Sequence, residues 1–384
     1  MNNLLLKFIN VLKSIKPEHM FSLLYGSYFF GMFFIFTTMN IGNFKYIAFF
    51  QMFLIFFVYP LCLLANLFLF KTYTVKKFLL HLILSLLFVF AVHKSGMMEL
   101  IHLWFMLLCT PPLEFKKIVG IIYKFLIVAV PLVMFFAITG GTYHVMYPRT
   151  EGIVPFMRYS FGFTSPNFMG AFLLEISLCL AYLKWGVWNN RDKFIMVVCL
   201  IIASVFCNCR TVALLMLAVF LLIVFYQSNY KEKIFSFIKY FSYFSLFFCP
   251  IFSFSVAVLY GYGCPIAFYL NELILHRFRN LCYSMHFFDI NLFGNGLKYT
   301  FDMLNISNAY GYLLIGYGTI AFIFLLAAYF FLIKKSIEVK NIAMLSLVTV
   351  YLYYGISEFV ILLPIFNMTL FALSKFLNNN VKNN

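Results

Sequence analysis

The chain has 384 residues, of which 64% are hydrophobic and only 10% are charged, and its formal net charge is +16. No soluble core needs so large an apolar fraction, and apolar runs long enough to cross a bilayer recur along nearly the whole length. A chain of soluble modules is therefore excluded. The lysines lie in short clusters between the apolar runs, a pattern typical of a membrane protein rather than of a nucleic-acid-binding protein.

We predict an all-α polytopic integral membrane protein with about twelve transmembrane helices. Residues 1–19 place apolar residues on one helical face beside lysines, so they are expected to form an interfacial helix on the cytoplasmic side. A single transmembrane domain is expected over residues 20–375, followed by a cytoplasmic tail at 376–384. The expected spans are 20–38, 46–70, 78–92, 96–110, 118–139, 168–184, 194–207, 211–227, 240–260, 309–332, 342–355 and 359–375.

The distribution of basic residues predicts the orientation of these spans. Of the 28 lysines and arginines, 19 fall in one alternating set of connections and 8 in the other, while Lys124 lies within a span. Because basic residues accumulate on the cytoplasmic side, both termini are expected inside. Lysines flank both ends of residues 194–227, so this stretch is expected to form a hairpin that turns at Asn208-Cys209-Arg210.

Two long connections, 140–167 and 261–308, are expected at the outer face and should contain short surface helices. Residues 267–288 of the second have helical periodicity and predict an amphipathic helix on the outer surface. Five of the six arginines fall outside, whereas 18 of the 19 inside basic residues are lysines. Because arginine is the better residue for bidentate phosphate contacts, this asymmetry indicates a phosphate-bearing ligand at the outer face. Local pairing or contact with lipid headgroups is the alternative.

Arg158, Arg210 and Arg277 come from three segments far apart in the sequence and are all expected at that face. Together they can hold a pyrophosphate and stabilise the charge that develops as it leaves. Arg279 is a weaker candidate, because Glu272 shares its helical face and can pair with it. The sequence has no acidic pair or His/Cys cluster with metal-ligand spacing, so we expect no metal site and no cofactor.

The stretch from Arg158 to Gly170 joins a polar segment to an apolar run. Asn167 follows Pro166 at the expected helix start, and it is predicted to cap the helix. Glu175 lies about two turns further on. An ionisable group buried in a span is a functional candidate, and a structural partner for an arginine is an equal alternative.

Several residues near the outer face are candidates for a general base. Asp302 and His286 lie in the second long connection, and Glu358 is expected to begin the last span from the outer side. In the same connection, Phe293-Gly294-Asn295-Gly296 has the composition of a turn.

Five stretches in this order resemble the Wzy polysaccharide polymerases and the related O-antigen ligases. They are RYSFGFTSPNFMG from residue 158, CRTVALLMLAVF from 209, LNELILHRF from 270, LFGNGL from 292 and ISNAYGYLLIGYGTIAF from 306. Each is loose alone, but their order is fairly specific, and the resemblance covers roughly residues 155–375. The late sequence YYGISE, which ends at Glu358, resembles the polymerase branch.

The resemblance implies an integral-membrane, metal-independent glycosyltransferase of the bacterial cytoplasmic (inner) membrane. Such enzymes join oligosaccharide repeats carried on undecaprenyl pyrophosphate into O-antigen, capsule or exopolysaccharide, in a pathway with a flippase and a chain-length regulator. By this resemblance Arg158, Arg210 and Arg277 hold the lipid-linked pyrophosphate. The other positions that it assigns to motifs are Gly162, Asn167, Gly294, Gly296, Asn308 and Tyr310.

The chain departs from the family at Ser307, where histidine or aspartate often precedes the asparagine and histidine is typical of ligases. This disfavours a ligase, which would transfer finished glycan to an acceptor, and leaves Asp302 as a substitute base by proximity. A flippase for lipid-linked oligosaccharides is an alternative from a different class. Flippases show repeat symmetry and polar groups along a path through the membrane, and the sequence shows neither clearly.

Overall fold

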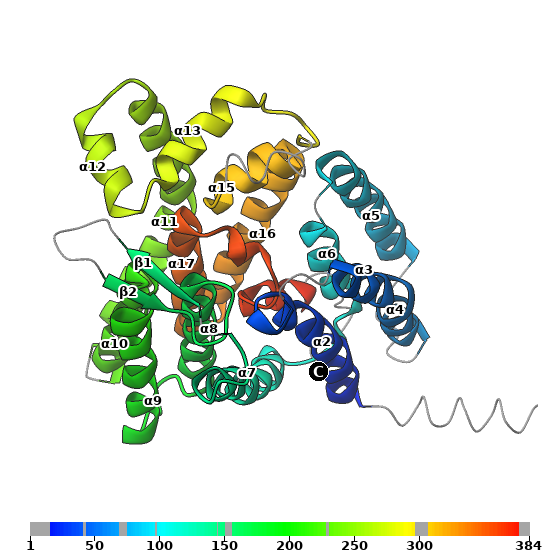
Figure 1. The fold of residues 1–384 in the computed structure, drawn as a ribbon. Coiled ribbons are helices and arrows are strands. Elements are labelled where there is room, and N and C mark those ends of the chain that lie inside the picture. Colours follow the sequence, from blue (N-terminus) through cyan, green and yellow to red (C-terminus); the bar gives the residue numbers. More distant parts are fainter. Residues whose placement is uncertain are drawn as a thin grey trace, which may run out of the picture.

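A computed structural model describes residues 16–40, 44–68, 75–96, 98–143, 145–149, 156–227, 230–295 and 306–375, and these are mostly helical (Figure 1). The α-helices are α2 (Pro17–Ile35), α3 (Phe44–Phe53), α4 (Tyr59–Phe68), α5 (Val75–Ser95), α6 (Glu99–Cys109), α7 (Phe115–Ile138), α8 (Pro166–Leu183), α9 (Asn190–Ile201), α10 (Arg210–Gln227), α11 (Lys231–Gly261), α12 (Pro265–Leu273), α13 (Arg277–Phe287), α15 (Ala309–Gly311), α16 (Thr319–Glu338) and α17 (Ile342–Ser357). The π-helical segments are η2 (Leu54–Val58), η3 (Ile202–Phe206) and η5 (Tyr312–Tyr317), and the 3₁₀ helices are η1 (Thr38–Asn40), η6 (Phe359–Leu362) and η7 (Met368–Leu373).

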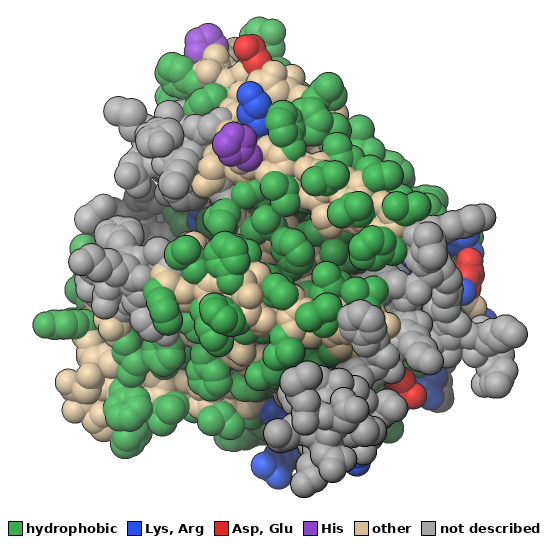
Figure 2. Space-filling view, turned by 90° about the vertical axis from the view of Figure 1, so that its right-hand side faces the viewer, with side chains coloured by type: hydrophobic (Ala, Val, Ile, Leu, Met, Phe, Trp, Pro, Cys, Tyr) green, Lys and Arg blue, Asp and Glu red, His purple; other side chains and the backbone are tan. Residues whose placement is uncertain are grey.

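Within these described residues, seven helical stretches are long and apolar enough to cross a membrane. They are Phe49–Leu67, Lys77–Ser95, Phe115–Ile138, Pro166–Leu183, Arg210–Gln227, Lys231–Gly261 and Thr319–Glu338. The face shown in Figure 2 is covered mainly by hydrophobic side chains, with charged ones nearer its margins. So large an apolar exterior suits lipid and not water. The chain is therefore an all-α, multi-pass membrane protein, as predicted.

Most predicted spans coincide with helices whose bounds differ from those expected. The span predicted at 46–70 is continuous through α3, η2 and α4, whereas α6 has only 11 residues and α11 has 31. The predicted hairpin within 194–227 is present, with its turn at Asn208 and with α10 beginning at Arg210. The span predicted at 309–332 is broken at Gly318. Its φ of +94° separates η5 from α16.

The last predicted span, 359–375, is not an α-helix, so the prediction of twelve transmembrane helices is wrong at this point. Pro364 has no N–H to donate within a helix, and the side chain of Asn367 accepts a hydrogen bond from Thr369 N at 3.2 Å. The segment instead forms two separate 3₁₀ turns, η6 and η7. Most of its residues are buried in the protein, where irregular backbone can be tolerated at membrane depth.

Aromatic contacts show how this segment lies against α2. Phe366 contacts Phe36, at the C-terminal end of α2, with ring centroids 5.0 Å apart. Phe371 contacts Phe21, near the N-terminal end of α2, at 5.3 Å. The segment therefore runs antiparallel to α2 through the interior of the bundle.

Side chains of α8 and α16 hold the irregular segment by hydrogen bonds. The carboxylate of Glu175 accepts a hydrogen bond from Met368 N at 2.9 Å and another from the Tyr351 hydroxyl. Asn367 donates to Tyr329 Oη at 2.7 Å and to Ile361 O at 2.8 Å. Glu175 is thus a structural partner of the C-terminal segment, and not of an arginine.

The first long connection contains a two-stranded antiparallel hairpin that was not predicted. Its strands are β1 (Met146–Arg149) and β2 (Phe156–Tyr159), with Tyr147 opposite Arg158. Beyond β2, the carbonyl of Gly162 accepts a hydrogen bond from Thr38 N at 2.9 Å. The hairpin is thereby fastened to the C-terminal end of α2. Gly162 has a φ of +84°, and a Cβ there would lie 3.1 Å from Val133 O, so this position needs glycine.

The amphipathic helix predicted at 267–288 is two helices, α12 and α13. Leu275 and His276 separate them with φ values of 57° and 62°, a left-handed conformation that ends α12. In Figure 1 both helices lie at the top, over the end of α11. This break turns the chain so that Arg277 begins a new helix.

Replacing Glu175 should destabilise the fold by removing the acceptor for two buried donors. We expect Glu175→Ala to lower the free energy of unfolding by about 3 kcal/mol, because each unsatisfied donor costs roughly 1–3 kcal/mol. Glu175→Gln should cost less, since its amide oxygen still accepts a hydrogen bond. Thermal unfolding in detergent, followed by size-exclusion chromatography, measures both. A melting temperature for Glu175→Ala equal to that of the parent would contradict this role.

Candidate functional site

Arg158, Arg210 and Arg277 line one pocket. Arg158 lies on β2, Arg210 begins α10 and Arg277 begins α13, so three distant segments supply the positive charges. The pocket contains about 450 Å³ of space outside protein atoms, including some open to solvent. The other lining residues are Asn167, Asn208, Cys209, Thr211, Val212, Leu273, Ile274, Leu275, Tyr354, Ser357 and Glu358.

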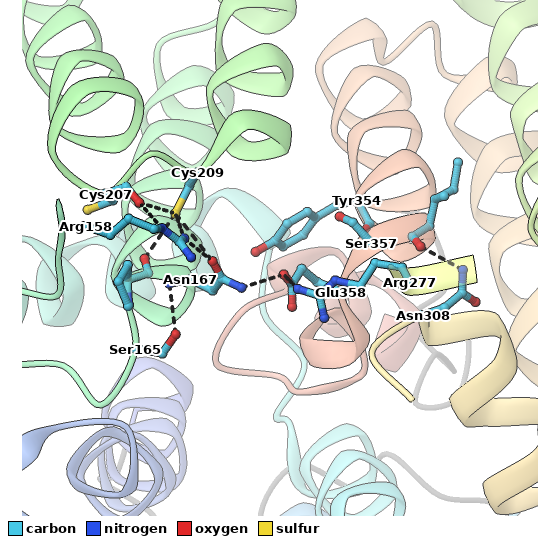
Figure 3. A network of polar contacts seen from close by, with 12 residues as sticks. Arg158, Ser165, Asn167, Cys207, Cys209, Arg277, Asn308, Tyr354, Ser357 and Glu358 are labelled. Atoms are coloured by element: carbon cyan, nitrogen blue, oxygen red, sulfur yellow. Dashed lines mark hydrogen bonds and ion pairs between the residues drawn. The ribbon is translucent and has the colours of Figure 1, made fainter. Parts of the chain in front are cut away.

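Arg158 is held in place by partners on two other segments (Figure 3). Its Nε donates to Cys207 O at 2.9 Å, and its Nη2 donates to Asn167 Oδ1 at 2.6 Å. The prediction that Asn167 caps α8 is wrong. Ser165 is the cap instead, because its hydroxyl accepts the hydrogen bond from Asn167 N. The side chain of Asn167 is left to bind within the pocket.

Glu358 connects the two sides of the pocket. It follows the last residue of α17 and accepts a hydrogen bond from Arg277 Nη2 at 2.7 Å. It also accepts from Asn167 Nδ2 at 3.2 Å. A continuous chain of contacts therefore runs from Arg158 through Asn167 and Glu358 to Arg277, as Figure 3 shows. Of the three candidate bases, Glu358 lies in the pocket.

Opposing effects act on the Glu358 carboxyl. Burial raises the pKa of Glu358 above its usual value, while the positive charges of Arg277 and Arg158 act to lower it. With Glu358 ionised, the three arginines leave two positive charges in excess among the described lining residues. The pocket therefore suits an anion with more than one negative charge.

Arg210 and the beginning of α10 also line the pocket. Asn208 adopts a left-handed conformation with φ 49°, which turns the chain out of η3, and the first residues of α10 line the pocket. The first N–H groups of a helix have no partner within it and carry partial positive charge. The Arg210 side chain is exposed, so it can reach a ligand at the pocket mouth.

Other predicted site residues lie elsewhere. Arg279 does not line the pocket, and its expected partner Glu272 lies 3.1 Å from His276 Nδ1 instead. His286 is exposed in the last turn of α13, at the opposite end of that helix from Arg277. Asp302 and Gly296 lie outside the described residues, as do residues 1–15 of the predicted interfacial helix and the tail 376–384.

The remaining motif residues support the backbone around the pocket. Asn308 caps α15, and its amide donates to Ile356 O at 2.7 Å. Tyr310 donates its hydroxyl to Leu352 O at 2.6 Å. Gly294 has a φ of +79°, and a Cβ there would lie only 2.0 Å from Gly316 O. The hydrogen bonds of Asn308 and Tyr310 position α17, and hence Glu358, whereas Gly294 packs against η5.

Sequence reasoning missed two features of this pocket. The first is the contact of Arg158 with two cysteines: its Nε donates to the backbone carbonyl of Cys207, and its Nη2 lies 3.7 Å from Cys209 Sγ. The pairing of Glu358 with Arg277 was also not predicted. The sequence feature that could have indicated this pairing is the small number of acidic residues. The chain has only 12, and Glu358 follows an apolar run at the predicted outer face, where the arginines are also expected.

Inorganic pyrophosphate should bind more tightly as the pH falls, because protonation removes the negative charge of Glu358 from the pocket. Because the pKa of Glu358 is raised, its carboxyl takes up a proton at a higher pH than an ordinary glutamate does. The gain in pyrophosphate affinity should therefore appear as the pH falls into that range, and it should be absent where Glu358 is fully ionised. Glu358→Gln should bind about tenfold more tightly than the parent at high pH. Titration calorimetry measures the affinity of both proteins for pyrophosphate at each pH. Protonation of pyrophosphate itself affects both proteins equally, so it cancels in the comparison. Identical pH dependence in the two proteins would refute this effect.

Comparison with protein-family models, curated proteins and solved structures finds no match to this chain.

Proposed function

We propose that this protein is an integral-membrane glycosyltransferase that polymerises undecaprenyl-pyrophosphate-linked oligosaccharide repeats into surface polysaccharide. The reaction would take place at the outer face of the bacterial cytoplasmic membrane. The observation that carries the proposal is the meeting of Arg158, Arg210 and Arg277 in one pocket of a multi-pass membrane protein. A ligand that is both lipid-linked and multiply anionic fits such a place.

The choice of arginine supports a phosphate ligand. A guanidinium group presents several donors in a plane and forms bidentate contacts with phosphate oxygens, whereas a lysine acts as a point charge. Arg158 binds Asn167, and Arg277 binds Glu358. These contacts hold the guanidinium groups in position before a phosphate arrives, which reduces the entropy that binding must offset.

The positions of lysines support an outer pocket with both termini inside. The pocket lies at the N-terminal ends of α8 and α10 and at the C-terminal end of α17. Lys184 follows the other end of α8, and Lys340 precedes the other end of α17. This is the expected bias toward the cytoplasmic side. In this topology the irregular segment 359–375 takes the place of the twelfth helical crossing.

In the proposed reaction, a sugar hydroxyl of one lipid-linked repeat attacks the anomeric carbon of the growing chain. The new glycosidic bond forms as the bond between that carbon and the pyrophosphate oxygen breaks. The hydroxyl proton passes to the Glu358 carboxylate, and undecaprenyl pyrophosphate leaves with its negative charge stabilised by the arginines. Glu358 is favoured over His286 because it lies in the pocket.

Arg277→Lys should abolish polymer while single repeats are still made and exported. Lysine keeps the charge but loses the planar donors, and removal of one such donor from a transition state costs about 10²–10³ in rate. Arg279→Lys is a matched control, because Arg279 lies on the same helix outside the pocket. Gel sizing of surface glycan at equal protein levels measures both. Normal polymer length in Arg277→Lys would contradict the proposal that Arg277 makes bidentate contacts with a phosphate.

Deletion of the gene distinguishes the proposed class from its alternatives. If the protein is a polymerase, its deletion should leave a surface product that contains only a single repeat. Long polymer that stays on its lipid carrier would indicate a ligase, and repeats trapped on the cytoplasmic side would indicate a flippase. Either of these two outcomes would replace the proposed function.

A further inference from the structure

An apolar stripe is exposed along α12. Ile266, Tyr269 and Leu273 follow at intervals of three or four residues, which places them on one face of α12. Tyr262 lies in the turn that precedes this helix. Tyr262, Ile266, Tyr269 and Leu273 are 85%, 70%, 67% and 48% exposed, respectively. We refer to these four residues as the α12 stripe.

The other side of α12 is packed against the protein. Ala267 and Asn271 are each 1% exposed, and Asn271 Oδ1 accepts a hydrogen bond from Arg279 N at 2.9 Å. This bond ties α12 to α13. The orientation of the helix is therefore fixed by its buried side, and the stripe faces away from the bundle.

The end of α11 determines the depth of α12. Only residues 262–264 separate Gly261, the last residue of α11, from Pro265, the first of α12. Such a link reaches at most about 14 Å. The apolar part of α11 after Lys239 is long enough to cross the hydrocarbon core of about 30 Å. Consequently, α12 lies close to the membrane surface.

The composition of the stripe favours lipid as its partner. Tyrosine is enriched where a protein meets the interface between acyl chains and headgroups, and two of the four residues are tyrosines. The single charged residue of α12, Glu272, lies off the stripe and contacts His276. An exposed apolar stripe beside a membrane span is buried best in the adjacent leaflet.

The same helix borders the arginine pocket. Leu273, Ile274 and Leu275 line the pocket, and Arg277 follows them at the start of α13. We infer that the α12 stripe is embedded in the outer leaflet and holds the pocket mouth at the level of the headgroups, so that the ligand enters from the bilayer. The identity of this ligand rests on the proposed function, but the contact of α12 with lipid does not.

Spin labels on the full chain in liposomes test the lipid contact. Cys264 and Cys282 are first replaced by serine, because they are the partly exposed cysteines among those described. A nitroxide at Ile266→Cys should collide mainly with oxygen dissolved in lipid. A nitroxide at Glu272→Cys, the control on the same helix, should collide mainly with a water-soluble nickel chelate. Equal nickel accessibility at both sites, or spin–spin broadening at 266 from a second copy, would overturn the inference.

A binding comparison tests the route of entry. Tyr269→Glu should weaken binding of undecaprenyl pyrophosphate from vesicles by at least about tenfold, because a carboxylate is disfavoured at the acyl boundary. It should leave the binding of inorganic pyrophosphate from water unchanged, and Glu272→Gln should change neither. Loss of both ligands, or of neither, in Tyr269→Glu would overturn bilayer entry. A parent that binds neither ligand would refute the proposed function, while the spin labels still decide the lipid contact.

Discussion

The ion pair between Arg277 and Glu358 is the contact on which the pocket depends. Three arginines gathered in a partly buried space repel one another, and Glu358 offsets part of that repulsion at 2.7 Å from Arg277. Through Asn167 the same carboxylate also reaches Arg158, so α8, α13, α17 and β2 are joined at one point. A phosphate would compete with Glu358 for Arg277. Ligand binding would therefore change the site first at this ion pair.

The second constraint is the absence of water in the membrane interior. Every buried backbone group there needs a partner within the protein, which restricts irregular chain to the inside of the bundle. In residues 359–375, Glu175 accepts from Met368 N, and the side chain of Asn367 binds the backbone at Ile361 O and Thr369 N. Glu358 comes directly before this segment, so the contacts that hold the segment also hold the end of α17 that carries the carboxylate.

Sequence alone could predict the membrane class, most of the apolar helices and the segments that supply the arginines, because hydropathy reports directly on contact with lipid. It could not predict which residue caps α8, since Ser165 and Asn167 are both good caps and the backbone decides between them. The break between α12 and α13 was missed because Leu275 and His276 have no turn signature. The partners Arg277 and Glu358 are 81 residues apart, and no local pattern connects them. The roles of the arginines in binding stay predictions, as do those of Asp302 and Gly296, outside the described residues.

A cryo-electron microscopy structure of the protein in a lipid nanodisc with undecaprenyl pyrophosphate tests the central claim most directly. We expect density for both phosphates between Arg158, Arg210 and Arg277, with Glu358 displaced from Arg277 by a phosphate oxygen. Density for the pyrophosphate at another site, with the pair of Arg277 and Glu358 intact, would contradict the account.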